Sequence, residues 1–147
     1  MAYITNTDID KRLGTATYLQ LSDDNNDGVA DAAVVDEARL GAEGEVDSYF
    51  ARRFQTPIAV SQEPQLAALI KSIVLDLVEV RLRSRRPPVS TNALQQAERA
   101  RDWLRRVASG AIELPLIGEV ATQASRGPIA DVVGSAKVLS RDELADF

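Results

Sequence analysis

The chain of 147 residues is 45% hydrophobic and 27% charged, with a formal net charge of −5, as expected for one globular domain with its own core. It contains neither cysteine nor histidine, which excludes disulfides, thiolate zinc sites and catalysis by a histidine base. No apolar run approaches the ~20 residues that span a bilayer and the first residues lack a signal core, so we expect neither a membrane span nor a secretion signal.

The charges are unevenly distributed along the chain. Residues 1–50 carry a net charge of −8, residues 51–110 one of +6, and residues 111–147 one of −3. This pattern predicts a molecule with an acidic end and a basic middle, a polarity that repeated copies could use to pack against one another. The alternative interpretation is chance clustering of charges on a solvated surface.

Two short helical segments are expected before the first long helix. Thr5 or Thr7 can cap a first helix that ends at Gly14, because threonine accepts a hydrogen bond at a helix start and glycine tolerates the backbone of a helix end. Residues 16–21 can form a second short turn, and residues 22–31 then form a polar loop.

The next helix is predicted from Ala32 to about Phe54, with Asp31 as its N-cap. Gly41 and Gly44 lie inside it, where they either admit a close neighbour or weaken the helix. Apolar residues recur in it at spacings of three and four, which is typical of one buried helical stripe. These residues are Val35, Ala38, Ala42, Val46, Tyr49, Phe50 and Phe54.

A third long segment is predicted from Pro64 to about Arg85. Proline is favourable in a first helical turn, because its missing N–H is not needed there. Apolar residues cover most of the circumference of this segment, which is typical of a helix buried centrally. Asp76 and Glu79 mark its expected solvent-facing side.

The last predicted helix begins at Ser90 or Thr91 and runs to Ser109, with Gly110 as the residue that ends it. Its expected buried stripe is made of Leu94, Ala97, Ala100, Trp103 or Leu104, and Val107. A tryptophan in such a stripe is interpreted as part of the core and not as a platform for a ligand.

Residues 111–147 have a different character, because prolines and glycines separate short β-branched pieces. We expect an extended arm without a core of its own, which adds a strand to a neighbour and ends in a helical turn over residues 140–147. The predicted fold is therefore all-α, with a bundle of about four main helices in residues 1–110 and an extended C-terminal arm in residues 111–147. The arm is expected to become ordered on assembly.

The polar loop resembles the start of a calcium-binding loop. Calcium prefers six to eight oxygen ligands, and Gly28 stands where the template has its glycine, but Val34 stands where the template has a bidentate glutamate. Calcium is therefore the one candidate ion, with weak affinity, and the alternative is a metal-free turn rich in Asp and Asn. The candidate ligands are Asp23, Asn25, Asp27, Val29 (through its carbonyl) and Asp31.

The remaining clusters of charged residues and glycines do not indicate catalysis. Arg81, Arg83, Arg85 and Arg86 cluster at a helix end, where they either contact DNA phosphate or an acidic partner or complement the helix dipole. No phosphate-binding glycine motif is present, and a carboxylate pair of Asp36 with Glu43 or Glu45 does not stand out from an exposed helix face. We therefore do not expect an enzyme, and no cofactor is required.

Several segments in this order resemble the phage protein family typified by the Mu-like neck protein, and the resemblance covers about residues 1–110. The segments that carry it are Met1-Ala2-Tyr3-Ile4-Thr5, Leu19-Gln20-Leu21-Ser22-Asp23, Asp27-Gly28-Val29-Ala30-Asp31, Asp47-Ser48-Tyr49, Ala51-Arg52-Arg53-Phe54-Gln55-Thr56-Pro57-Ile58 and Arg83-Ser84-Arg85-Arg86-Pro87-Pro88.

The resemblance implies a structural virion protein, a head–tail connector (adaptor) whose copies form a ring, commonly of twelve, beneath the portal protein. Such a ring extends the DNA channel, docks the next neck or tail protein, and lets DNA pass without sequence-specific binding. The protein is then expected in the neck of the virion, and in the cytoplasm of the bacterial host before assembly. The alternative function is a calcium-responsive protein-binding module with an incomplete EF-hand-like loop.

Overall fold

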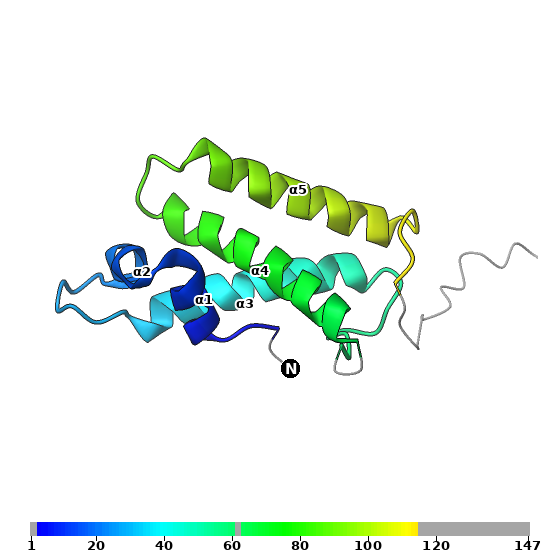
Figure 1. The fold of residues 1–147 in the computed structure, drawn as a ribbon, viewed down its shortest axis with the longest axis horizontal. Helices are drawn as coiled ribbons and strands as arrows, with labels where there is room; N and C mark the ends of the chain where they lie inside the picture. The colour runs from blue at the N-terminus through cyan, green and yellow to red at the C-terminus, as the bar shows by residue number, and fades with distance from the viewer. Residues whose placement is uncertain (1–2, 61–62, 115–147) are drawn as a thin grey trace, which may run out of the picture.

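The computed structural model describes residues 3–60 and 63–114. Within these ranges the chain folds into α-helices with no strand (Figure 1), which confirms the all-α prediction. Most of the predicted arm, residues 115–147, lies outside the described residues. The helices are α1 (Asn6–Leu13), α2 (Thr15–Ser22), α3 (Ala32–Phe50), α4 (Pro64–Ser84) and α5 (Thr91–Ala108).

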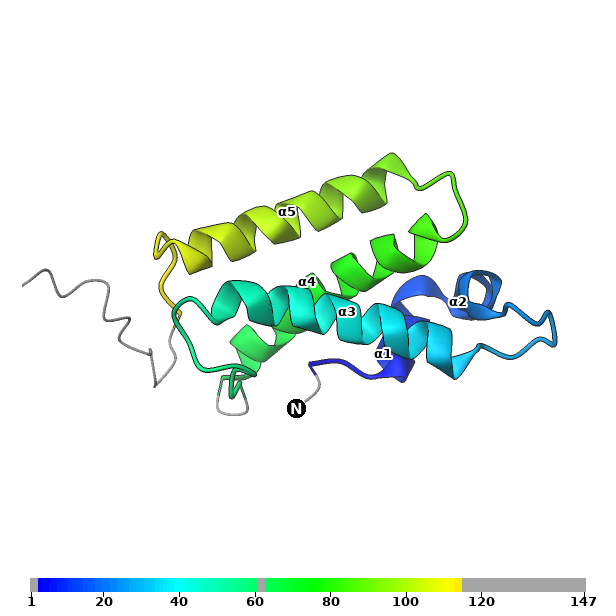
Figure 2. The same cartoon turned by 180° about the vertical axis from the view of Figure 1, so that it is seen from behind.

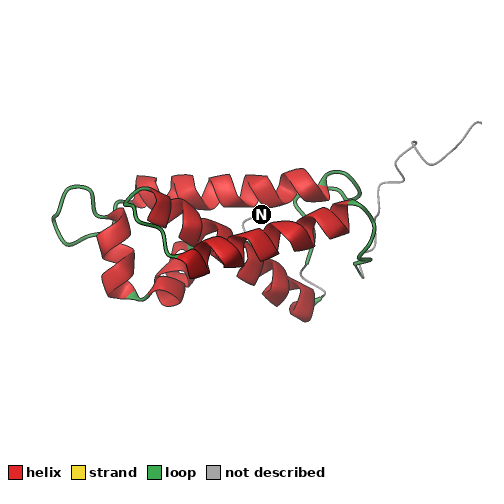
Figure 3. Ribbon diagram, turned by 90° about the horizontal axis from the view of Figure 1, so that it is seen from above, coloured by secondary structure: helices red, strands yellow, loops and turns green. Residues whose placement is uncertain are grey.

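The three long helices form the body of the molecule. α3 and α5 run in one direction and α4 runs back between them (Figures 1 and 2). The short helices α1 and α2 pack against α3 and α4 near the start of α3 (Figure 3). α4 contacts each of the other four helices, as its nearly continuous apolar surface predicts.

The predicted helix starts are correct at two sites. The Thr5 hydroxyl accepts a hydrogen bond from the Asp8 backbone N–H, while the Asp8 carboxylate accepts one from the Thr5 N–H, so the two residues form a capping box. Thr7 lies inside α1. The Ser90 hydroxyl caps α5 by accepting from the Ala93 N–H, and Gly110 follows that helix with a positive φ of 82°.

Two details of α3 differ from the prediction. Asp31 holds the N-cap position, but its carboxylate does not bond the start of the helix; it bonds Asp24 and Asn25 within the preceding loop. The helix ends at Phe50 and not at Phe54. Phe54 nevertheless returns to the core, where its ring meets that of Phe50 edge-on at 6.3 Å.

Two surface assignments were wrong. Asp76 and Glu79 were expected to face solvent, but their side chains are only 17% and 14% exposed because both contact Arg12 of α1. Leu94 was expected in the buried stripe of α5 but is 48% exposed, and Ala93 takes its place in the core. Trp103 is half-buried beside the fully buried Leu104.

The core extends a little beyond the predicted helical domain. Ile112 and Leu114 pack against it after the end of α5, and the Ala111 and Ile112 N–H groups donate to the Arg106 carbonyl. Within the described ranges, no helix combines the length and the apolarity that crossing a lipid bilayer requires.

Candidate functional site

The loop between α2 and α3, residues 23–31, projects at one end of the molecule (Figures 1 and 2). Asn26 and Gly28 adopt the left-handed backbone, with φ of 58° and 81°. Asparagine and glycine are the residues that enter this region at the lowest cost. The sequence Asn25-Asn26-Asp27-Gly28 therefore suits a loop that reverses direction within a few residues.

The carboxylates of this loop accept hydrogen bonds from the loop itself. Asp23 accepts from the Asp27 N–H at 3.2 Å and from the Gly28 N–H at 2.8 Å. Asp27 accepts from the Val29 N–H at 2.9 Å. Asp31 accepts from the Asp24 N–H at 2.9 Å and from the Asn25 side-chain amide at 3.0 Å. The bond between Asp27 and Val29 spans two residues and has the pattern of an Asx turn, whereas the others join the Asp23 and Asp31 carboxylates to more distant parts of the loop.

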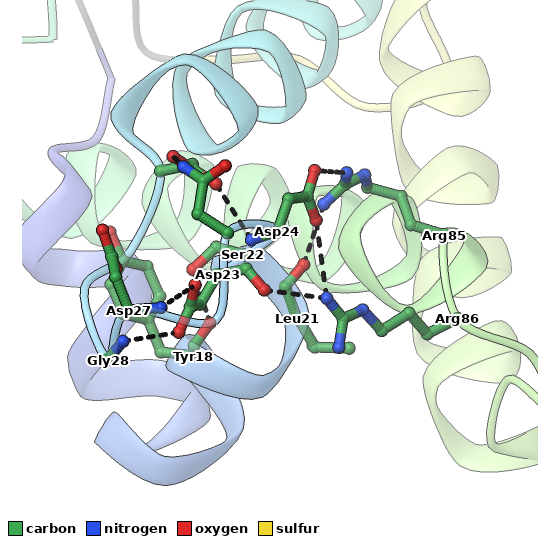
Figure 4. A network of polar contacts seen from close by, with 11 residues as sticks. Tyr18, Leu21, Ser22, Asp23, Asp24, Asp27, Gly28, Arg85 and Arg86 are labelled. Carbon is green, nitrogen blue, oxygen red and sulfur yellow. Dashed lines mark hydrogen bonds and ion pairs between the residues drawn. The ribbon is translucent and has the colours of Figure 1, made fainter.

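Two arginines at the end of α4 hold the loop from the other side (Figure 4). Arg85 donates to the Leu21 carbonyl at 2.9 Å and to the Asp24 carboxylate. Arg86 donates to the Asp23 carbonyl at 2.9 Å and lies 3.5 Å from the other Asp24 oxygen. The hydrogen bond from Arg85 lowers the pKa of Asp24 below its usual value. We call this set of contacts, made by Arg85 and Arg86 to residues 21–24, the arginine clamp.

The proposed calcium ligands therefore all lie in one loop, and three of their carboxylates are already engaged by N–H donors. Val29 is 65% exposed, and Val34 at the template's last ligand position is partly buried. Asp36, the first carboxylate after Val34, accepts hydrogen bonds from Asn6 and Arg39. Among residues 3–60 and 63–114, no group of three histidine, cysteine, aspartate or glutamate side chains gathers as a metal set. Weak calcium binding by this loop stays a prediction, which calorimetric titration with calcium would test.

The arginine cluster at the end of α4 makes contacts that the sequence interpretation did not anticipate. Arg85 and Arg86 form the clamp, Arg83 pairs with Glu79 at 2.8 Å, and Arg81 pairs with Glu45 at 2.9 Å. The carboxylates that this cluster contacts therefore belong to the same chain, namely Asp24, Glu45 and Glu79.

The same holds for the uneven charge along the sequence. Asp8 pairs with Lys71 at 2.6 Å, and Glu45 receives Arg101 at 2.8 Å as well as Arg81. Burial raises the pKa of Glu45, but hydrogen bonds from Arg101 and Arg81 outweigh it and leave that pKa below its usual value. Part of the charge of the acidic first third and of the basic middle is therefore paired inside one subunit. The packing of copies through the remaining polarity stays a prediction.

A second polar site joins the start of the chain to α3. Glu43, only 8% exposed, accepts from the Tyr3 N–H at 2.9 Å and from the Ile4 N–H at 3.3 Å. The Tyr3 hydroxyl donates to Asp47 and accepts from the Ile58 N–H at 2.9 Å. Sequence reasoning placed Glu43 on an exposed helix face. The one available signal was its position beside Ala42 on the buried side of α3.

The described surface also carries isolated apolar side chains and two grooves. One groove, of about 500 Å³, lies among α3, α4 and α5 and includes Arg81, Arg85 and Arg101. The other, of about 400 Å³, lies between α4 and α5 with Arg12 at its edge. The exposed large apolar residues are Val29, Leu40, Leu69 and Leu94.

Among the residues that the structure describes, we find surfaces suited to binding but no arrangement of catalytic side chains. The comparison with known protein families is therefore the main evidence on function. No curated protein matches it. The family model described as bacteriophage Mu, Gp36 matches residues 3–131, which extends past the segments on which the resemblance to phage neck proteins rested. The chain belongs to the bacteriophage Mu Gp36 family.

Proposed function

We propose that the protein is a structural component of the virion, a head–tail connector whose copies form a ring beneath the portal protein. The ring extends the DNA channel and docks the next neck or tail protein. The observation that carries this proposal is the family match over residues 3–131. The order of neck-protein-like segments from Tyr3 to Pro88 supports it.

The described fold is compatible with a ring. A closed ring is built from heterologous contacts, in which each subunit presents two different surfaces to its two neighbours. Leu40 on α3 is 59% exposed and Leu94 on α5 is 48% exposed, so two separate helices each offer an apolar contact point. Single exposed apolar residues are ordinary on a soluble protein, and these two are therefore candidates to be tested by substitution.

The proposal includes the role of DNA and the place of assembly. DNA passes through the ring without sequence-specific contacts, because the arginine cluster of α4 is engaged by the chain's own carboxylates and oxygens. The protein is not an enzyme and requires no cofactor. It assembles in the cytoplasm of the bacterial host and remains in the neck of the virion.

The test is the mass and shape of the purified full-length chain, measured by native mass spectrometry and negative-stain electron microscopy. We expect a closed ring, commonly of twelve subunits, that binds purified portal protein. A chain that stays monomeric at every concentration and does not bind the portal protein would contradict the proposal.

Substitutions sharpen this test. Leu40→Asp and Leu94→Asp each place a charge on an exposed apolar side chain and should reduce ring formation while leaving the helical circular dichroism unchanged. Ser48→Asp is the matched control, because Ser48 is an exposed polar residue of α3. Equal assembly by all three variants would show that neither leucine lies in a subunit contact.

A further inference from the structure

The groove between α4 and α5 has an apolar floor that the described chain leaves partly uncovered. Leu69 of α4 is 43% exposed at its edge, and Ile73 lies beside it with only 5% of its surface exposed. Trp103 of α5 is half-buried, with its ring edge-on to Phe50 at 6.4 Å. An exposed leucine beside an incompletely buried tryptophan leaves room for one or two apolar side chains.

The rim of this groove carries one positive charge that is not neutralised. Asp76 is engaged by Arg12, which also approaches Glu79 at 3.6 Å. Arg99, in contrast, is exposed and has no ion pair with any residue in 3–60 or 63–114. The groove therefore favours an occupant that joins apolar side chains to carboxylates.

The chain itself contains such a segment. Residues 142–147 read Asp142-Glu143-Leu144-Ala145-Asp146-Phe147, which combines three carboxylates with a leucine and a phenylalanine. The sequence predicts a helical turn here, in which residues three positions apart, such as Leu144 and Phe147, share one face. The segment lies outside the described residues and beyond residue 131, where the family match ends.

We infer that residues 142–147 dock into the groove between α4 and α5 of their own chain. Leu144 and Phe147 cover Leu69 and Trp103, and the carboxylates of the segment face Arg99. The contact goes beyond the proposed connector function. It covers an apolar surface of the single subunit with a segment that follows the family match over residues 3–131.

The length of the intervening chain allows this contact. The roughly 27 residues between Leu114 and Asp142 have a root-mean-square span of about 30 Å if flexible, whereas Arg99 lies only about 14 Å along α5 from its last residue. Tethering also gives the segment an effective concentration on the order of millimolar at the groove. Docking within one chain is therefore favoured over docking between dilute copies, even where the intrinsic affinity is weak.

Trp103 provides the test, because it is the single tryptophan of the chain and lies in the groove. In the full-length variant Leu144→Ser/Phe147→Ser, the emission of Trp103 should shift to the red, and acrylamide should quench it more strongly. Arg99→Glu should produce the same change in the wild-type chain but add nothing when combined with Leu144→Ser/Phe147→Ser. Arg106→Glu is the control, because Arg106 is exposed on the same helix outside the groove. Unchanged emission and quenching in Leu144→Ser/Phe147→Ser would overturn the inference.

The absence of cysteine allows a second measurement that identifies the chain that supplies the segment. Ser72→Cys in the groove, combined with Ala145→Cys, should form a disulfide within one chain on oxidation, seen as a faster-migrating monomer on a non-reducing gel. Ser48→Cys with Ala145→Cys is the control, because Ser48 lies on α3, away from the groove. Disulfide-linked dimers from the groove pair, or equal cross-linking by both pairs, would overturn the inference.

Discussion

Tyr3 connects three parts of the fold that are distant in the sequence. Its backbone N–H reaches Glu43, its hydroxyl donates to Asp47, and the same hydroxyl accepts from the Ile58 N–H. Burial and the hydrogen bond to Asp47 raise the pKa of this phenol. The backbone and side chain of Tyr3 therefore hold the N-terminal segment to α3 and to the segment before α4.

Tyr3→Phe should lower the free energy of unfolding by about 1–3 kcal/mol, because it leaves the Ile58 N–H without an acceptor in a partly buried site. Urea denaturation followed by circular dichroism measures this change. Tyr49→Phe is the control, because Tyr49 is partly buried but has no hydrogen bond from its hydroxyl among the described residues. Equal stability of the two variants would show that the Tyr3 hydroxyl contributes nothing.

Asp8 contributes to the acid stability of the protein through its ion pair with Lys71. The hydrogen bond from Lys71, followed by that from the Thr5 N–H, lowers the pKa of Asp8 from 3.8 to about 2. The folded-state pKa lies below the unfolded-state pKa, so the contribution of this group is complete above pH 3.8 and is lost as the pH falls toward 2.

Lys71→Gln should therefore reduce the steepness with which the melting temperature falls between pH 4 and pH 2. Thermal unfolding followed by circular dichroism across this range measures the slope. Lys11→Gln is the control, because Lys11 is exposed and forms no ion pair among the described residues. The interpretation fails if Lys71→Gln and the wild-type chain lose stability in parallel.

Sequence reasoning reached these residues only in part. The Thr5 cap and its polar first turn follow from local rules, so both could be predicted. The contacts of Asp8 with Lys71 and of Tyr3 with Ile58 join residues 63 and 55 positions apart. Local patterns carry no information on such pairs, because the packing of whole helices decides which side chains meet.

At the scale of the helices, apolar periodicity located α3, α4 and α5 within a few residues. It failed at Leu94, because Ala93 on the same helix supplies the small buried side chain that packs there. It also failed at the last turn of α3, where the chain leaves the helix after Phe50 and still returns Phe54 to the core. Periodicity records which face is apolar and does not record where a chain bends.

The two glycines of α3 differ in their surroundings. A Cβ atom at Gly44 would meet no atom within 4 Å, whereas one at Gly41 would lie 2.8 Å from the guanidinium of Arg81. Gly41 therefore leaves room for the arginine that pairs with Glu45, while Gly44 only weakens the helix.

Gly44→Ala should raise the free energy of unfolding by about 1 kcal/mol through helix propensity alone. Gly41→Ala should gain less, because the tip of Arg81 must move and its exposed ion pair with Glu45 is worth at most about 1 kcal/mol. Chemical denaturation of both variants measures the difference. A larger gain at Gly41 than at Gly44 would contradict the assigned role of Arg81.

At the scale of the whole molecule, the arginine clamp joins the loop of residues 23–31 to the end of α4. The double variant Arg85→Ala/Arg86→Ala removes the clamp, so the loop should open more often. Each opening breaks the hydrogen bonds from the Asp27 and Gly28 amides to Asp23, and hydrogen exchange at these amides should accelerate. Melting temperature should change little, since exposed ion pairs contribute little to stability. Hydrogen exchange followed by mass spectrometry measures the effect, with Arg52→Ala/Arg106→Ala as the control for lost positive charge.

The polar loop of residues 23–31 could be predicted from the sequence, but its contacts with the arginine clamp could not. Positions 23–28 hold Asp, Asn and Gly residues, which are typical of a tight polar turn. Arg85 and Arg86 were visible as a basic cluster, but no local pattern indicated that they meet Asp24. The charge segregation of the chain was itself the signal, since opposite charges in separate segments can neutralise one another when those segments pack.

This internal neutralisation has a consequence for how copies of the protein meet. Oppositely charged patches speed diffusional encounter by orienting two molecules before they touch, whereas unsteered partners associate at roughly 10⁵–10⁶ M⁻¹ s⁻¹. Arg81, Arg85 and Arg101 are already paired with carboxylates of their own subunit and exert little such long-range guidance. Each copy also carries a net charge of −5, so encounters between copies should not be accelerated by attraction. Their rate should rise as added salt screens the repulsion.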